Sequence, residues 1–130
     1  MCLVRYRGGV PTSERHLSAE EQAVILTLLA QDFPGVDELR AQVPSAVVTG
    51  GCGCGCATVN LRTEGGPLAL AVPARKGVVV SAGVRGRGDG VLLFVEEGRL
   101  SCLEVYSCED APAPLPRPED LVIDPPDSWE

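Results

Sequence analysis

The stretch VLLFVEEGRLSCLEVYS (residues 91–107) contains two apolar runs separated by charged and glycine residues. This pattern predicts a β-hairpin that turns near Glu97 and Gly98. If the turn has two residues, Glu96 would face Arg99. In the same register Leu93 would face Cys102, and Val91 would face Glu104. Both faces of the hairpin would be apolar, so we expect it to lie inside a sheet with each side covered.

Further strand candidates show the same alternation before the hairpin, separated by glycines and prolines. They lie at residues 46–49, 57–61, 68–72 and 78–84. Together with the hairpin, these segments predict a mainly antiparallel sheet of four to six strands across residues 45–108.

A pair of helices is predicted before the sheet, over residues 17–43. Ser18 and Glu21 have the spacing of a capping box, in which each side chain accepts a hydrogen bond from the other residue's backbone amide. Apolar residues recur at helical spacing through residues 19–31, and a second short helix ends before Pro44. The predicted fold class is therefore α+β, with two N-terminal helices packed on the sheet.

The two ends of the chain are expected to add extended segments to a single domain of residues 1–130. Residues 1–16 contain glycines, a proline and charges of both signs, which predicts an arm. Residues 109–130 are rich in proline, which neither donates to a strand ladder nor continues a helix. We expect an extended, polyproline-like tail laid over the surface.

The composition favours a folded protein inside the cell. The chain is 45% hydrophobic and 22% charged, with a net charge of -7. Such an acidic chain repels phosphate groups, which disfavours binding to nucleic acids and to anionic membranes. No apolar run is typical of a secretion signal or a transmembrane helix, so we expect a cytoplasmic location. Cysteines in that compartment are usually reduced or bound to metal.

One dense cluster of reactive side chains is present, formed by Cys52, Cys54 and Cys56 in alternation with glycines. Thiolates are preferred zinc ligands, and residues two apart on a strand share one face. The glycines allow the backbone to bend and bring the three sulfurs together. A tetrahedral zinc ion needs a fourth ligand, for which Cys102 is the candidate and Cys108 the competitor.

The cysteine cluster is also compatible with two roles that need no metal. Cysteine is a small apolar residue, so the cluster could pack a strand against the helices. Alternatively, one thiolate could act in a thiol-dependent enzyme or a redox sensor, which requires a nearby base or helix N-terminus. His16 is the one histidine of the chain, and no complete catalytic set accompanies it.

Three motifs follow one another along the chain: DFPG at residues 32–35, CGCGCATV at residues 52–59 and GRLSCLEVY at residues 98–106. Their order and spacing resemble a family of small uncharacterised bacterial proteins. The likeness spans residues 19–118 and implies one compact domain. Because the family has no assigned activity, the resemblance implies no substrate, cofactor or site residue.

The sequence favours a non-enzymatic protein that binds a partner. A hairpin with two apolar faces and a long tail with apolar anchors offer surfaces for a protein partner or for self-association as a homodimer. Zinc at the cysteine cluster is the one cofactor that we expect. The alternative function is the thiol-dependent enzyme or redox sensor.

Overall fold

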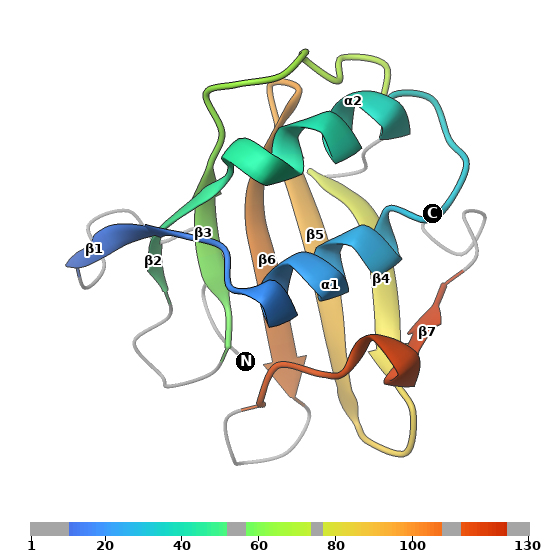
Figure 1. Ribbon diagram of the computed structural model, residues 1–130. Coiled ribbons are helices and arrows are strands. Elements are labelled where there is room, and N and C mark those ends of the chain that lie inside the picture. Colours follow the sequence, from blue (N-terminus) through green and yellow to red (C-terminus); the bar gives the residue numbers. More distant parts are fainter. Residues whose placement is uncertain (1–10, 52–56, 74–76, 108–112, 125–130) are drawn as a thin grey trace.

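The structure is a computed structural model that describes residues 11–51, 57–73, 77–107 and 113–124. Within these residues the chain forms one sheet of seven strands and two α-helices (Figure 1). The strands are β1 (Pro11–His16), β2 (Val47–Gly51), β3 (Val59–Arg62), β4 (Val78–Val84), β5 (Asp89–Glu96), β6 (Arg99–Ser107) and β7 (Leu121–Ile123). Their order across the sheet is β1-β2-β3-β6-β5-β4-β7, and all neighbouring strands are antiparallel.

Helices α1 (Ala19–Leu28) and α2 (Val36–Gln42) lie across one face of the sheet (Figure 1). Short 3-10 helices occur at Val43–Ser45 and Pro118–Asp120. Both layers contribute large, fully buried apolar side chains: Ile25, Leu28, Leu29, Leu39, Leu93, Leu100 and Leu103. Each such side chain stabilises the fold by about 1.5–3 kcal/mol relative to an exposed position. The α+β class predicted from the sequence is confirmed.

The sheet has more strands than the four to six that the sequence predicts. Its two outermost strands, β1 and β7, come from segments that the sequence assigned to the arm and to the tail. An edge strand needs ladder hydrogen bonds on one side only, so it tolerates nearby prolines. In β7, the buried Leu121 pairs with Val84 of β4, which anchors the tail to the sheet.

Residues 68–72, predicted as a strand, form a loop instead. Prolines flank the segment on both sides and cannot donate hydrogen bonds to a ladder. The apolar alternation is present, but it buries the small side chain of Ala69 and leaves Leu68 and Leu70 exposed. A strand that exposes its largest apolar side chains gains little from pairing, and this segment does not join the sheet.

The hairpin of β5 and β6 has the predicted two-residue turn. Glu97 and Gly98 have φ angles of 52° and 80°, and a type I′ turn requires positive φ at both central positions. Next to the turn, Glu96 pairs with Arg99 as predicted. The sequence therefore identified the turn and the first pairs of the ladder correctly.

Beyond these pairs the predicted register is wrong. A β-bulge beside Phe94 shifts the ladder, so that Cys102 pairs with Phe94 and Glu104 with Leu92. A bulge adds one residue to one strand, and side chains beyond it change faces. Cys102 and Phe94 consequently form a small apolar cluster of their own, outside the core beneath the helices. Glu104 is buried on the same strand face as Cys102.

The capping box predicted at the start of α1 is confirmed. Ser18 Oγ accepts a hydrogen bond from the Glu21 amide at 3.0 Å, and Glu21 Oε1 accepts one from the Ser18 amide at 2.9 Å. Arg15 of β1 donates to both oxygens of the same carboxylate, each at 2.9 Å. The Arg15 guanidinium, together with the Ser18 amide, lowers the pKa of Glu21. Glu21 thus links helix α1 to the edge strand β1 through hydrogen bonds.

Replacing Glu21 by glutamine should lower the free energy of unfolding by about 1 kcal/mol at neutral pH, because the charge that holds Arg15 is lost. The folded-state pKa of Glu21 is lowered, so its stabilisation is present above the ordinary glutamate value of 4.5 and fades as the pH falls below it. The two proteins should therefore converge in stability as the pH falls below the lowered pKa of Glu21. Denaturant titrations across this range measure the difference. A pH-independent difference would contradict this role, and Glu20→Gln on the exposed side of α1 is the control.

Candidate functional site

The predicted zinc ligands fall into two groups. Cys52, Cys54 and Cys56 lie outside the described residues, so their metal site stays a prediction. Cys102 lies on β6, where its Cα pairs with that of Asn60 on β3. Strand β3 directly follows the connection that contains the cysteine cluster.

Cys102 is 1% exposed and packs against Phe94. Buried cysteines surrounded by apolar side chains are typical of packing residues. His16 is exposed on the edge strand β1. Among the residues that the structure describes, no three or more His, Cys, Asp and Glu side chains are grouped so as to hold a metal ion.

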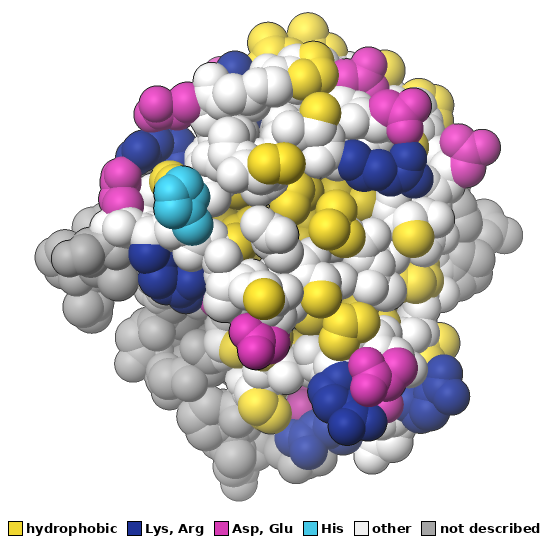
Figure 2. Space-filling view, in the orientation of Figure 1, with side chains coloured by type: hydrophobic (Ala, Val, Ile, Leu, Met, Phe, Trp, Pro, Cys, Tyr) yellow, Lys and Arg dark blue, Asp and Glu magenta, His cyan; other side chains and the backbone are white. Residues whose placement is uncertain are grey.

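A more prominent surface feature is the apolar loop, which we define as residues 65–73 between β3 and β4. Leu70 exposes 73% of its surface and Leu68 exposes 46%. The exposed apolar residues of the loop are Pro67, Leu68, Leu70, Ala71 and Pro73. Figure 2 shows hydrophobic side chains gathered at the upper end of the molecule, where this loop runs in Figure 1. Contiguous exposed apolar patches are typical of interaction sites.

The buried side chain of Gln42 holds this loop in place. Gln42 Nε2 donates to the carbonyl oxygens of Pro67 and Gly98, at 2.8 and 2.7 Å. Its Oε1 accepts a hydrogen bond from the Leu100 amide at 2.9 Å. One side chain at the end of α2 therefore connects the helix, the loop and the β5–β6 hairpin. No sequence pattern around Gln42 predicted this role.

The hairpin turn supports the loop directly. The Ala69 amide donates to the Gly98 carbonyl at 2.9 Å, and Arg99 donates to the Gly65 carbonyl at 3.3 Å. A Cβ atom added at Gly98 would lie 2.9 Å from Leu70 Cδ2. The loop thus rests on the turn, while both of its leucines remain exposed to solvent.

Acidic side chains lie beside the apolar loop. Glu96 and Glu97 at the hairpin turn are exposed, and neither makes an ion pair within the part of the chain that the structure describes. An apolar patch with a charged rim is the usual organisation of a protein interface. The rim favours a partner that presents basic groups around an apolar site.

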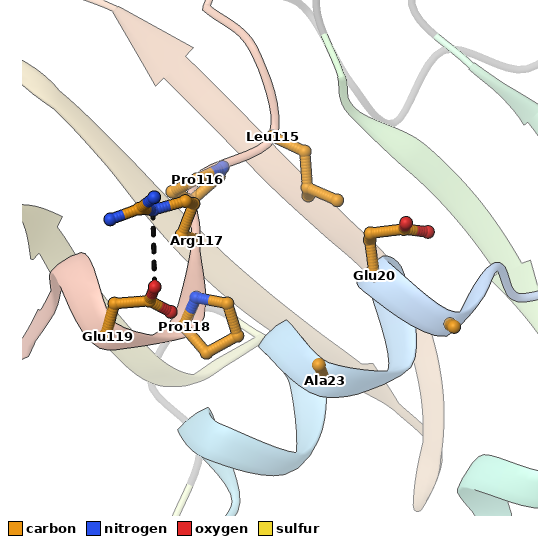
Figure 3. Close-up of a pocket in the computed structure, with 8 residues that line it drawn as sticks. Glu20, Ala23, Leu115, Pro116, Arg117, Pro118 and Glu119 are labelled. Atoms are coloured by element: carbon orange, nitrogen blue, oxygen red, sulfur yellow. Dashed lines mark ion pairs between the residues drawn. The ribbon is translucent and has the colours of Figure 1, made fainter.

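A groove of about 450 Å³ lies at the other end of the sheet. It runs between the first turns of α1 and the segment after β6, and we call it the α1 groove. Its lining is mainly apolar and consists of Ala19, Glu20, Ala23, Leu115, Pro116, Arg117, Pro118 and Glu119. Figure 3 shows Leu115 and the two prolines on one side, with Ala23 and Glu20 on the other.

Three arginines lie in the segments at this end of the molecule. The Arg85 amide donates to the Asp120 carbonyl at 2.7 Å, which holds the β4–β5 turn beside the α1 groove. Arg117 pairs with Glu119 at 3.3 Å. Arg87 pairs with the buried Asp89 at 2.5 Å, and this contact lowers the pKa of Asp89. Figure 2 shows basic side chains at the lower end of the view, with acidic side chains next to them.

Comparison of the chain with protein families, with curated proteins and with solved structures finds no match. The resemblance suggested by the three sequence motifs therefore stays a prediction. Among the described residues, no helix is both long and apolar enough to span a bilayer.

Proposed function

We propose that the protein is a non-enzymatic partner-binding module, and that the apolar loop is the element that enters a complementary apolar site on a partner protein. The exposure of Leu70, 73% in a loop anchored by backbone hydrogen bonds, carries this proposal. Because hydrogen bonds already hold the neighbouring backbone at Pro67 and Ala69, burying Leu70 costs mainly the rotamer freedom of one side chain. Its transfer into an apolar site contributes about 1.5–3 kcal/mol.

The arrangement of the loop supports a specific contact rather than non-specific hydrophobic association. Two leucines project from one anchored segment, and buried apolar anchors of this kind supply most of the binding energy in protein interfaces. Glu96 and Glu97 beside them add charge selectivity, because like-charged partners are repelled. The expected partner therefore presents an apolar cavity with arginine or lysine near its rim.

A photo-crosslinking residue in place of Leu70 tests this proposal. Introduced during synthesis in cells, p-benzoylphenylalanine at position 70 should give a discrete crosslinked protein product on irradiation. The same residue at Ala30, which is exposed and is not part of the loop, is the matched control. The product should disappear when Leu68→Asp is added, because a buried charge opposes docking. No product at position 70, or the same products at both positions, would contradict the proposal.

Zinc bound by Cys52, Cys54, Cys56 and Cys102 would add a structural or regulatory metal to this module. This part of the proposal rests on the sequence pattern alone. Elemental analysis and a thiol count on protein purified without chelator would test it independently of the docking function.

A further inference from the structure

We propose that the α1 groove binds a peptide segment of a partner protein in which an apolar side chain stands next to lysine or arginine. The groove shares no residue with the apolar loop, so this inference goes beyond the proposed function and does not depend on it. The lining offers apolar walls for the side chain of such a segment and carboxylates at the rim for its cation.

The walls of the groove are apolar and only partly covered by the rest of the chain. Ala23 on α1 lies opposite Leu115, Pro116 and Pro118 (Figure 3). These four residues are partly buried, and Ala19 beside them is exposed. An apolar side chain placed between the walls would remove apolar surface from water on both partners.

Carboxylates outnumber guanidinium groups at the rim of the groove. Two lining residues are acidic, Glu20 and Glu119, and one is basic, Arg117. Arg117 pairs with Glu119 at 3.3 Å and with Asp120 at 3.5 Å, so two carboxylates already share its charge. Glu20 is exposed and makes no ion pair within the part of the chain that the structure describes. The rim therefore attracts a cation, whereas an anion would have to displace the existing pairs.

Two other positive features at this end of the molecule do not reverse that preference. The N-terminus of α1 carries partial positive charge, but the Glu21 carboxylate already lies against it and accepts the hydrogen bond of the Ser18 amide. Arg85 and Arg87 lie in the β4–β5 turn and do not line the groove, and Arg87 pairs with the buried Asp89. The net charge of -7 adds long-range attraction for a basic partner.

The openness of the groove to solvent favours a peptide over a small molecule. A small-molecule site usually covers about 70–90% of its ligand. None of the residues that line the α1 groove is fully buried, so the groove covers one side of an occupant. Pro114, Pro116 and Pro118 have no backbone N–H to donate to an added strand, so recognition relies on side chains.

Two capped peptides that differ only in charge, GKLLKG and GELLEG, test this site on the isotope-labelled full chain. In two-dimensional NMR titrations, GKLLKG should shift the amide signals of Ala19, Ala23 and Leu115. It should bind about tenfold more tightly than GELLEG, because each exposed charge pair changes from attraction to repulsion. Added salt should weaken its binding, since exposed pairs are screened.

Four variants separate the charged contribution from the apolar one. Glu20→Gln should weaken GKLLKG binding about two- to fivefold. Asp32→Asn removes the same charge at an exposed position outside the groove and should leave binding unchanged. Ala23→Leu fills the groove, suits a helix and should weaken binding about tenfold or more. Ala30→Leu, an exposed position outside the groove, should bind like the natural protein. The NMR spectrum of each variant shows whether it is folded.

GKLLKG binding that follows this pattern would support the proposal. Equal binding of both peptides, binding of neither, or unchanged binding to Ala23→Leu would overturn it. Hexylammonium, a small cation with an apolar chain, tests the small-molecule alternative. If it binds as tightly as GKLLKG, the groove takes small amphiphilic cations and the peptide proposal is wrong. The crosslink at position 70 reports on the apolar loop alone, so the two proposals can fail independently.

Discussion

Replacing Gln42 by methionine is expected to lower the free energy of unfolding by about 3 kcal/mol. The Gln42 side chain is 0% exposed and makes three hydrogen bonds to backbone groups of other elements. Methionine has a similar length and no amide, so the Pro67 carbonyl and the Leu100 amide would lose this partner. A buried backbone group left unpaired costs about 1–3 kcal/mol. The Gly98 carbonyl would keep its bond from Ala69.

Denaturant unfolding followed by circular dichroism measures this change. Gln31→Met, at a half-buried position beyond α1, is the control and should change stability by less than about 0.5 kcal/mol. Amide hydrogen exchange should also become faster in the apolar loop of the Gln42 variant, because its anchor to α2 is lost. Equal stability of the two variants would show that the loop does not depend on Gln42.

Replacing Gly98 by alanine is expected to lower the free energy of unfolding by about 2–3 kcal/mol. Part of the cost is backbone strain, since Gly98 has a φ of 80° that alanine adopts unfavourably. The rest comes from the apolar loop, because the new Cβ would lie 2.9 Å from Leu70 Cδ2 and 3.1 Å from the Ala69 nitrogen. The loop would have to move away from the turn that supports it.

Gly86 provides a matched control that separates the cost of the loop contact from the cost of backbone strain. It has a similar φ of 77°, but a Cβ added there meets no atom within 4 Å. Gly86→Ala should therefore cost only the backbone strain, about 1–2 kcal/mol. The excess cost of Gly98→Ala, measured in the same unfolding experiment, is the contribution of the loop contact. An equal cost at both glycines would mean that the loop adapts freely.

The local patterns of the sequence predicted the structure well where neighbouring residues decide it. Ser18 and Glu21 are three residues apart, and their reciprocal hydrogen bonds form as predicted. The turn at Glu97 and Gly98 was also predicted, since glycine at the second turn position favours the type I′ geometry. The bulge beside Phe94 has no comparable sequence signal, and the ladder beyond it was predicted incorrectly.

Contacts between distant segments could not be predicted from these patterns. Gln42 lies 25 residues from Pro67 and 56 residues from Gly98, so nothing in its surroundings along the chain indicates its role. The segment at residues 68–72 alternates as a strand would, and only the flanking prolines indicate a loop. The cysteine cluster is the most conspicuous chemical feature of the sequence, whereas the surfaces that the structure describes are the apolar loop and the α1 groove.

Mapping the crosslink formed from residue 70 by mass spectrometry tests most directly whether the apolar loop is a docking element. The predicted result is a discrete adduct between position 70 and an apolar site on a partner protein, absent when Leu68→Asp is added. Adducts confined to the same chain, or no adduct on irradiation in cells, would contradict the proposed docking role of the loop.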